Sequence, residues 1–184
     1  MSGAAIPRAT VPCLGAALIV SWGVSYYLIG VFGHRIAADL GWPLSLVHGG
    51  FTAALLTMAS VSIWAGRLVD EHGGRIAMAL GAALTAAGCV GIASTREPLL
   101  YYASWICLGV SMRLTLYDAA FAALARIGGA GAGTAMAQVT LFGGLASTIF
   151  WPVGEALADW LGWRGAVLVY AALSLAAIPL YLGI

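Results

Sequence analysis

Charged residues divide this chain into long uncharged runs, and these runs decide what it can fold into. A helix needs about 20 mainly apolar residues, at ~1.5 Å rise each, to cross the hydrocarbon core of a membrane. Six runs approach that length, so we expect six transmembrane helices near residues 11–32, 47–65, 76–93, 99–124, 135–153 and 166–182. The fourth is the one that contains internal charges. About 14 residues connect the first two expected helices, the longest connection in this scheme.

The composition excludes a soluble globule. Of the 184 residues, 62% are hydrophobic and only 8% are charged, whereas about a quarter of residues are charged in soluble domains. We therefore expect an all-α membrane protein, with residues 1–184 forming one six-helix domain in a lipid bilayer. The net charge is +1, and all eight basic residues are Arg. This gives no basic field for nucleic acid, which we exclude as a partner.

No residue set points to catalysis, metal or cofactor. His34 and His48 belong to one side of the membrane and His72 to the other, about 30 Å away across the hydrocarbon core. The cysteines lie in apolar runs without the spacing of a zinc site or a redox pair; they are Cys13, Cys89 and Cys107. We expect a protein that is not an enzyme, with no catalytic residues, no metal site and no cofactor.

Two connections between the expected helices resemble each other. They begin at Gly66 (GRLVDEHGGRIA) and at Gly154 (GEALADWLGWRGA). A shift of 89 residues aligns Asp70 with Asp159, Gly73 with Gly162 and Arg75 with Arg164. Because three spans separate the copies, they lie on opposite membrane faces. This predicts a 3+3 inverted repeat, a plan that secondary transporters use, with repeats at about residues 11–95 and 99–184.

The first of these loops resembles a family signature. Its Gly66, Leu68, Asp70, Gly73 and Arg75 are similar to the loop between helices two and three of the major facilitator superfamily, including its monocarboxylate-transporter-like members. The run DWLGWRGAVLVYAAL from Asp159 resembles that family's entry into helix six, and the resemblance covers about residues 21–182. The loop departs from the family pattern at Glu71 and Gly74, where basic residues are usual.

The resemblance implies a twelve-helix transporter, of which this chain is equivalent to the N-terminal half. In that arrangement the first and fourth helices line the pathway, the second and fifth face the other half, and the third and sixth are outermost. The chain is then a truncated transporter, a natural half that pairs with itself or a partner chain, or a six-helix protein that does not transport.

The resemblance also implies an integral protein of the membrane, such as a bacterial inner membrane, with both termini cytoplasmic. Arg residues near the span ends favour this orientation by four to three. Those on the side of the N-terminus are Arg8, Arg67, Arg75 and Arg126, and those on the other side are Arg35, Arg96 and Arg164.

A charge inside the fourth helix indicates the solute site. Arg113 lies near mid-span, where a charge costs at least ~2.5–3.5 kcal/mol and needs water, a partner or a substrate. Tyr117 follows on the same helical face, and Tyr26 and Tyr27 interrupt the first helix. We expect these four residues to bind solute, although Arg113 paired with an acid of the other half, and tyrosines in ordinary packing, remain alternatives.

A gating latch is expected at the signature loop. A straight helix rotates Asp118 roughly 140° away from Arg113, so Asp118 is not expected to be its partner. By resemblance, Asp118 instead pairs with Arg75, and the latch comprises Gly66, Asp70, Gly73, Arg75 and Asp118. A proton-coupling role for Asp118 is the alternative.

The sequence thus predicts alternating-access transport of a small organic solute, best an organic anion or monocarboxylate. The first alternative is efflux of hydrophobic drugs, which requires Trp22, Phe142 and Phe150 to dominate the cavity and Arg113 to be sequestered. The second is a membrane scaffold subunit that does not transport.

Overall fold

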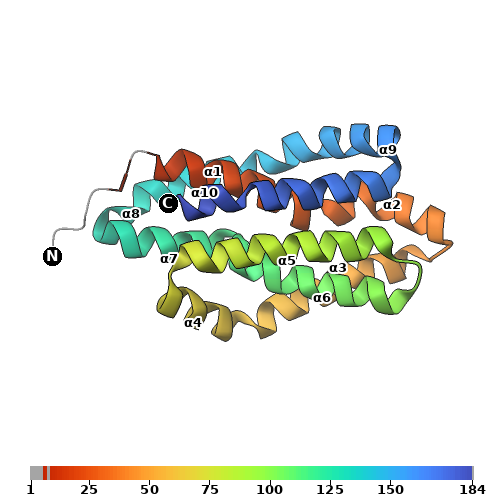
Figure 1. Cartoon of the computed structure of the whole chain (residues 1–184), viewed down its shortest axis with the longest axis horizontal. Helices are drawn as coiled ribbons and strands as arrows, with labels where there is room; N and C mark the ends of the chain where they lie inside the picture. Colours follow the sequence, from red (N-terminus) through yellow and green to blue (C-terminus); the bar gives the residue numbers. More distant parts are fainter. Residues whose placement is uncertain (1–5, 8, 184) are drawn as a thin grey trace.

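A computed structural model gives the structure of the chain and describes residues 6, 7 and 9–183. Arg8, counted above among the positive charges, lies outside them. The described chain is built from helices (Figure 1). These are α1 (Thr10–Ser21), the π-helical η1 (Trp22–Tyr26), α2 (Leu28–Leu40), α3 (Leu44–Ser60), α4 (Ser62–His72), α5 (Gly74–Ser94), α6 (Pro98–Thr115), α7 (Tyr117–Gly128), the 3-10 turn η2 (Gly129–Gly131), α8 (Ala132–Gly144), α9 (Ala146–Ala176) and α10 (Ile178–Leu182).

The helices run back and forth along the long axis of the bundle (Figure 1). By length and apolar composition, four described segments suffice to span a membrane: Thr10–Leu40, Gly74–Ser94, Pro98–Gly128 and Ala132–Leu182. The pair α3 and α4, bent by 55°, qualifies as one further span.

The segment Ala132–Leu182 accounts for two spans. Its 51 residues would extend ~77 Å as one straight helix, more than twice a hydrocarbon core of about 30 Å. Gly162 interrupts the helical backbone inside α9 with φ 72° and ψ 163°, and the light blue and dark blue parts of this segment run in opposite directions (Figure 1). The predicted all-α bundle of six spans is confirmed.

The first connection is shorter than predicted. The chain remains helical through Arg35 and Asp39 to Leu40, and α3 begins at Leu44. Gly41 ends α2 in the left-handed conformation with φ 65°, and extended Pro43 precedes α3. The expected long loop was wrong because charged residues were taken to end the helix, whereas both side chains form ion pairs.

The third span, α5, packs closely against α6 and α9 through small residues. A Cβ built on Gly81 would lie 2.6 Å from Cγ2 of Thr115, and one on Gly88 would lie 2.7 Å from Cγ of Leu108. Ser174 of α9 donates a hydrogen bond of 2.8 Å to the carbonyl of Ala82. Close backbone approach of this kind drives helix association in lipid.

Each end of the bundle has its own apolar core. We call the end where α1 begins and α10 finishes the termini end, and the other the opposite end (Figure 1). The core toward the termini end includes Met78 and Tyr181, and the core toward the opposite end includes Trp105 and Tyr170.

The two similar loops share an unusual backbone. Gly73 has φ 84° and ψ 157°, and Gly162 has φ 72° and ψ 163°. This region of backbone space is essentially restricted to glycine. The match supports the 3+3 inverted repeat, and the repeat boundaries at about 11–95 and 99–184 stay a prediction.

Candidate functional site

The first span is interrupted at mid-length by the π-helical segment η1. Gly23 lies in this segment, and a Cβ there would lie 2.1 Å from the ring of Phe150. The side chain of Phe150 therefore occupies the space that any residue larger than glycine at position 23 would need. Single π turns of this kind frequently mark functional positions. The interruption predicted at Tyr26 and Tyr27 coincides with the last residue of this segment and the residue that follows it.

Half-buried aromatic side chains gather where η1 meets the fourth span. The ring of Trp22 lies 5.0 Å from that of Tyr26 and 5.0 Å from that of Tyr117. Tyr27 lies 5.6 Å from Tyr26, and Phe121 stacks on Tyr117 at 5.4 Å. The structure thus brings together three of the four predicted solute-binding residues, Tyr26, Tyr27 and Tyr117. We call Trp22, Tyr26, Tyr27, Tyr117 and Phe121 the aromatic cluster.

The aromatic cluster also has polar groups. The hydroxyl of Tyr117 donates to the carbonyl of Thr140 on α8 at 3.1 Å. The indole Nε1 of Trp22 is buried and has no hydrogen-bond partner in the described part of the chain. A buried N–H without a partner is costly, and Nε1 of Trp105 and Nε1 of Trp163 are in the same state in the described chain.

Arg113, the fourth predicted solute residue, is engaged by an acid. Its Nη1 lies 2.6 Å from Oδ2 of Asp118, with side-chain exposures of 23% and 52%. The expectation that Asp118 points away was wrong. It assumed a continuous helix, whereas Leu116 is extended (φ −85°, ψ −164°) and separates α6 from α7.

The predicted latch residues divide between two hollows at the termini end. Gly66, Asp70 and Asp118 line a hollow of about 190 Å3 together with Arg113. Arg75 lines a separate hollow of about 310 Å3 beside Gly73. The described ion pairs therefore join Asp118 to Arg113, not to Arg75 as the resemblance implied.

Arg126 connects this loop to the fourth span, a contact that the sequence did not indicate. Its Nη1 donates to the carbonyl of Asp70 at 2.9 Å and to that of Val69 at 3.4 Å. Both carbonyls belong to the last turn of α4, where helical acceptors need partners from outside the helix. The carbonyl of Val69 also accepts from the N–H of Gly73 at 2.9 Å. The α7 side chain therefore caps the C-terminal end of α4.

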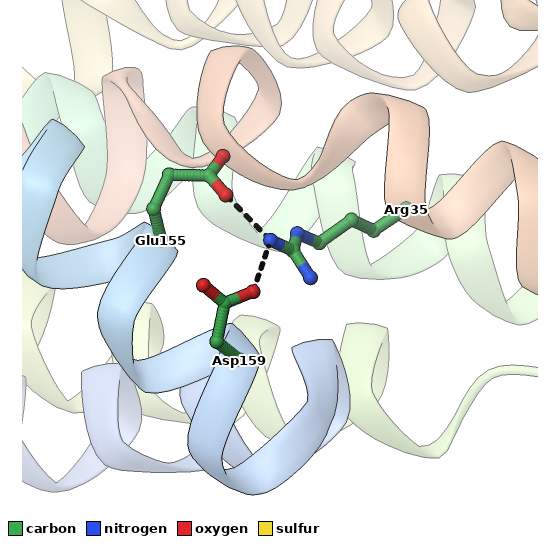
Figure 2. Close-up of polar contacts among 3 residues, drawn as sticks. All are labelled: Arg35, Glu155 and Asp159. Carbon is green, nitrogen blue, oxygen red and sulfur yellow. Dashed lines mark hydrogen bonds and ion pairs between the residues drawn. The ribbon is translucent and has the colours of Figure 1, made fainter.

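An ionic cluster at the opposite end also escaped the sequence analysis (Figure 2). Nη2 of Arg35 on α2 lies 2.6 Å from a carboxylate oxygen of Glu155 and 2.6 Å from one of Asp159. The two acids are one turn apart on α9 and so share a helical face. Close by, Arg164 pairs with Asp39 and donates to the carbonyl of Thr95 at 3.0 Å.

The signal for this cluster was present in the sequence. Arg35 and Asp39 are four residues apart, as are Glu155 and Asp159. Complementary charges at that spacing on two helix ends suit pairing, but nothing in the sequence specified which ends meet.

These features define the class: a helical membrane protein of six passes, with its first span broken by a π segment against the fourth. The chain belongs to the Major Facilitator Superfamily, whose family model matches residues 13–184. It is also similar to Multidrug resistance protein MdtL of Klebsiella pneumoniae, with 37% identity over 67 residues. That match covers 36% of this chain and 17% of the relative, so the matched segment spans less than a fifth of the relative's length.

Proposed function

We propose that this chain forms one half of a secondary active transporter that moves a small organic solute by alternating access. Membership of the family and the six-span bundle support this proposal. The second half is a continuation of the same polypeptide, a second copy or a partner chain. Spans two and five, expected to face it, expose large apolar side chains, among them Leu56, Ile63, Trp64 and Leu141.

We propose that the solute is apolar and aromatic, as in hydrophobic-drug efflux. The observation that carries this choice is the 2.6 Å ion pair of Arg113 with Asp118 beside a half-buried aromatic cluster. An anion would compete with Asp118 for Arg113, so the prediction of a monocarboxylate loses its main support. The relative's printed name, a multidrug resistance protein, agrees with an apolar solute.

The aromatic cluster provides the contacts for such a solute. Aromatic faces bind flat or cationic organic molecules through stacking and cation–π attraction. Tyr26, Tyr27 and Tyr117 supply faces and hydroxyls, and Trp22 supplies a further aromatic face. The efflux alternative named Phe142 and Phe150 as well. Phe150 is buried against Tyr170, with ring centroids 5.4 Å apart, and Phe142 packs over Gly15, so we leave both out of the solute site.

We propose that the signature loop works as a gating latch through Gly66, Asp70, Gly73, Arg75 and Asp118. Asp70 and Asp118 line the same hollow as Arg113. Because one guanidinium can bind either carboxylate, movement of α4 against α7 would exchange Arg113 between them. We further propose that the termini end is cytoplasmic and that the protein lies in a bacterial inner membrane.

Transport assays test the solute class. The full chain in proteoliposomes is compared for transport of a lipophilic aromatic cation dye and of a labelled monocarboxylate. We expect dye transport, reduced at least tenfold by Trp22→Ala and unaffected by Trp160→Ala, a matched control whose residue is 83% exposed. Monocarboxylate uptake that depends on Arg113, without dye transport, would instead support the organic-anion prediction. Transport of neither solute would favour the scaffold alternative.

A further inference from the structure

The termini end contains a basic hollow that lies apart from the proposed solute site, although the latch residues Gly73 and Arg75 line it. Its volume is about 310 Å3, and it lies between the turn after α4, the first turn of α5 and the end of α7. His72, Arg75 and Arg126 contribute its ionisable side chains. No acidic residue is among the described residues that line it.

Two of these basic groups are available to an anion. Within residues 6–7 and 9–183, Arg75 forms no ion pair, and Arg126 uses only Nη1 in its hydrogen bonds. The two bonds from Arg126 to the end of α4 hold its guanidinium at the rim. His72 is less free, because Nδ1 lies 4.0 Å from a carboxylate oxygen of Glu71.

The start of α5 adds backbone donors to the same hollow. Gly73 precedes this 21-residue helix, and because it has no side chain it cannot cap the first N–H groups of the helix. The first bond into the helix runs from the N–H of Ala77 to the carbonyl of Gly73, at 3.4 Å. The N–H groups of Gly74, Arg75 and Ile76 therefore precede the regular ladder, where donors and the helix dipole favour an anion.

An apolar stripe begins at the hollow and continues along α5. Five exposed residues with helical spacing form it: Ile76, Leu80, Ala83, Ala87 and Val90. From first to last they extend about 21 Å at 1.5 Å per residue, more than the roughly 15 Å depth of one hydrocarbon leaflet. The acyl chains of a lipid whose headgroup lies at the hollow can therefore contact apolar side chains of α5 over the full depth of their leaflet.

We propose that this hollow binds the phosphate of an anionic membrane phospholipid, whose acyl chains lie along the exposed face of α5. The shared chemistry is a phosphate oxygen facing guanidinium and backbone N–H donors. A free phosphate offers the same oxygens but nothing that would cover the stripe, which favours the lipid. The site lies at the membrane boundary and includes no residue of the aromatic cluster.

The test measures lipid binding and does not depend on transport. The full chain is delipidated in mild detergent and titrated separately with phosphatidylglycerol, phosphatidylcholine and inorganic phosphate, with bound species counted by native mass spectrometry. We expect phosphatidylglycerol to bind in preference to phosphatidylcholine. Arg75→Gln and Arg126→Gln should each weaken phosphatidylglycerol binding about fivefold. Arg96→Gln is the matched control, because it removes an exposed Arg from the opposite end.

Three outcomes would overturn the proposal: equal binding of phosphatidylcholine, an equal loss of binding in Arg96→Gln, or displacement of the lipid by equimolar inorganic phosphate. The last would identify a free-anion site instead. Since Arg126 also caps α4, the melting temperature of Arg126→Gln is recorded in parallel. If that variant does not fold, Arg75→Gln decides the test alone.

Discussion

Arg113 and Asp118 form an ion pair, 2.6 Å from Nη1 to Oδ2, across the break between α6 and α7. In an unbroken helix, residues five apart point in directions roughly 140° apart. The extended residue Leu116 removes that constraint. The pair therefore depends on the break, and the break holds both charges beside the signature loop.

Removing either member of this pair should destabilise the bundle more than removing both. Each single variant, Arg113→Ala or Asp118→Ala, leaves one charge without its partner near apolar side chains. We expect a coupling free energy of ~1 kcal/mol in a double-mutant cycle, measured by thermal unfolding in detergent. Arg67→Ala, an exposed Arg outside the described ion pairs, is the control. Additive effects of the two substitutions would contradict a direct pair.

The two loop glycines should resist substitution for a reason of backbone geometry alone. Gly73 and Gly162 both adopt a positive φ with extended ψ, and a Cβ at either position would meet no atom within 4 Å. Gly73→Ala and Gly162→Ala should each cost ~1–3 kcal/mol of unfolding free energy. Gly133→Ala, in helical α8 with equally open space, should be neutral or stabilising. Wild-type melting temperatures for both loop variants would show that the backbone conformation is wrong.

Gly23→Ala should disrupt the π segment through contact with Phe150. The new methyl group would lie 2.1 Å from the ring, so either the ring or the helix must shift. Such overpacking costs ~1–3 kcal/mol. In the background of Phe150→Ala the same substitution should cost clearly less, as thermal unfolding of the four proteins would report. An unchanged cost in that background would locate the constraint elsewhere.

Arg35→Ala should lower the melting temperature more than either Glu155→Gln or Asp159→Asn. Loss of Arg35 leaves two neighbouring carboxylates facing each other, whereas loss of one acid leaves Arg35 with a partner. All groups are partly exposed, so added salt should reduce the differences through screening. Melting curves at low and high ionic strength test this, with Arg96→Ala as control. A difference that is independent of salt would argue for lost packing instead of lost charge pairing.

The sequence was sufficient to predict the number and order of the spans because an unpaired charge in the hydrocarbon core of a bilayer costs free energy. Long uncharged runs left few other solutions, and the loop beginning at Gly66 indicated the family. The ends of the spans were less predictable. Arg35 and Asp39 extend the first span because Asp159 and Arg164, more than 100 residues away, neutralise them.

The candidate site was predictable in its residues more than in its arrangement. Tyr26, Tyr27 and Tyr117 were expected to meet because spans one and four were expected to line the pathway. The role of Trp22 as the centre of the aromatic cluster depends on η1, which in turn depends on Phe150 packing over Gly23. No glycine or proline in the sequence indicates the break at Leu116. The ion pair with Asp118, which engages Arg113, therefore could not be predicted.

The π segment also restricts how the first span can change length. A π turn accommodates one residue more than an α turn over the same stretch, so η1 sets the angular offset between α1 and α2. A deletion of one residue within η1 can be absorbed when the π turn becomes an α turn, but a deletion elsewhere in the first span would rotate one half of the span by about 100° relative to the other. Either Leu14 and Leu18 would leave the core near Tyr181, or Arg35 would turn away from α9. Insertions and deletions in the first span outside η1 should consequently be rarer among natural homologues than substitutions of the same side chains.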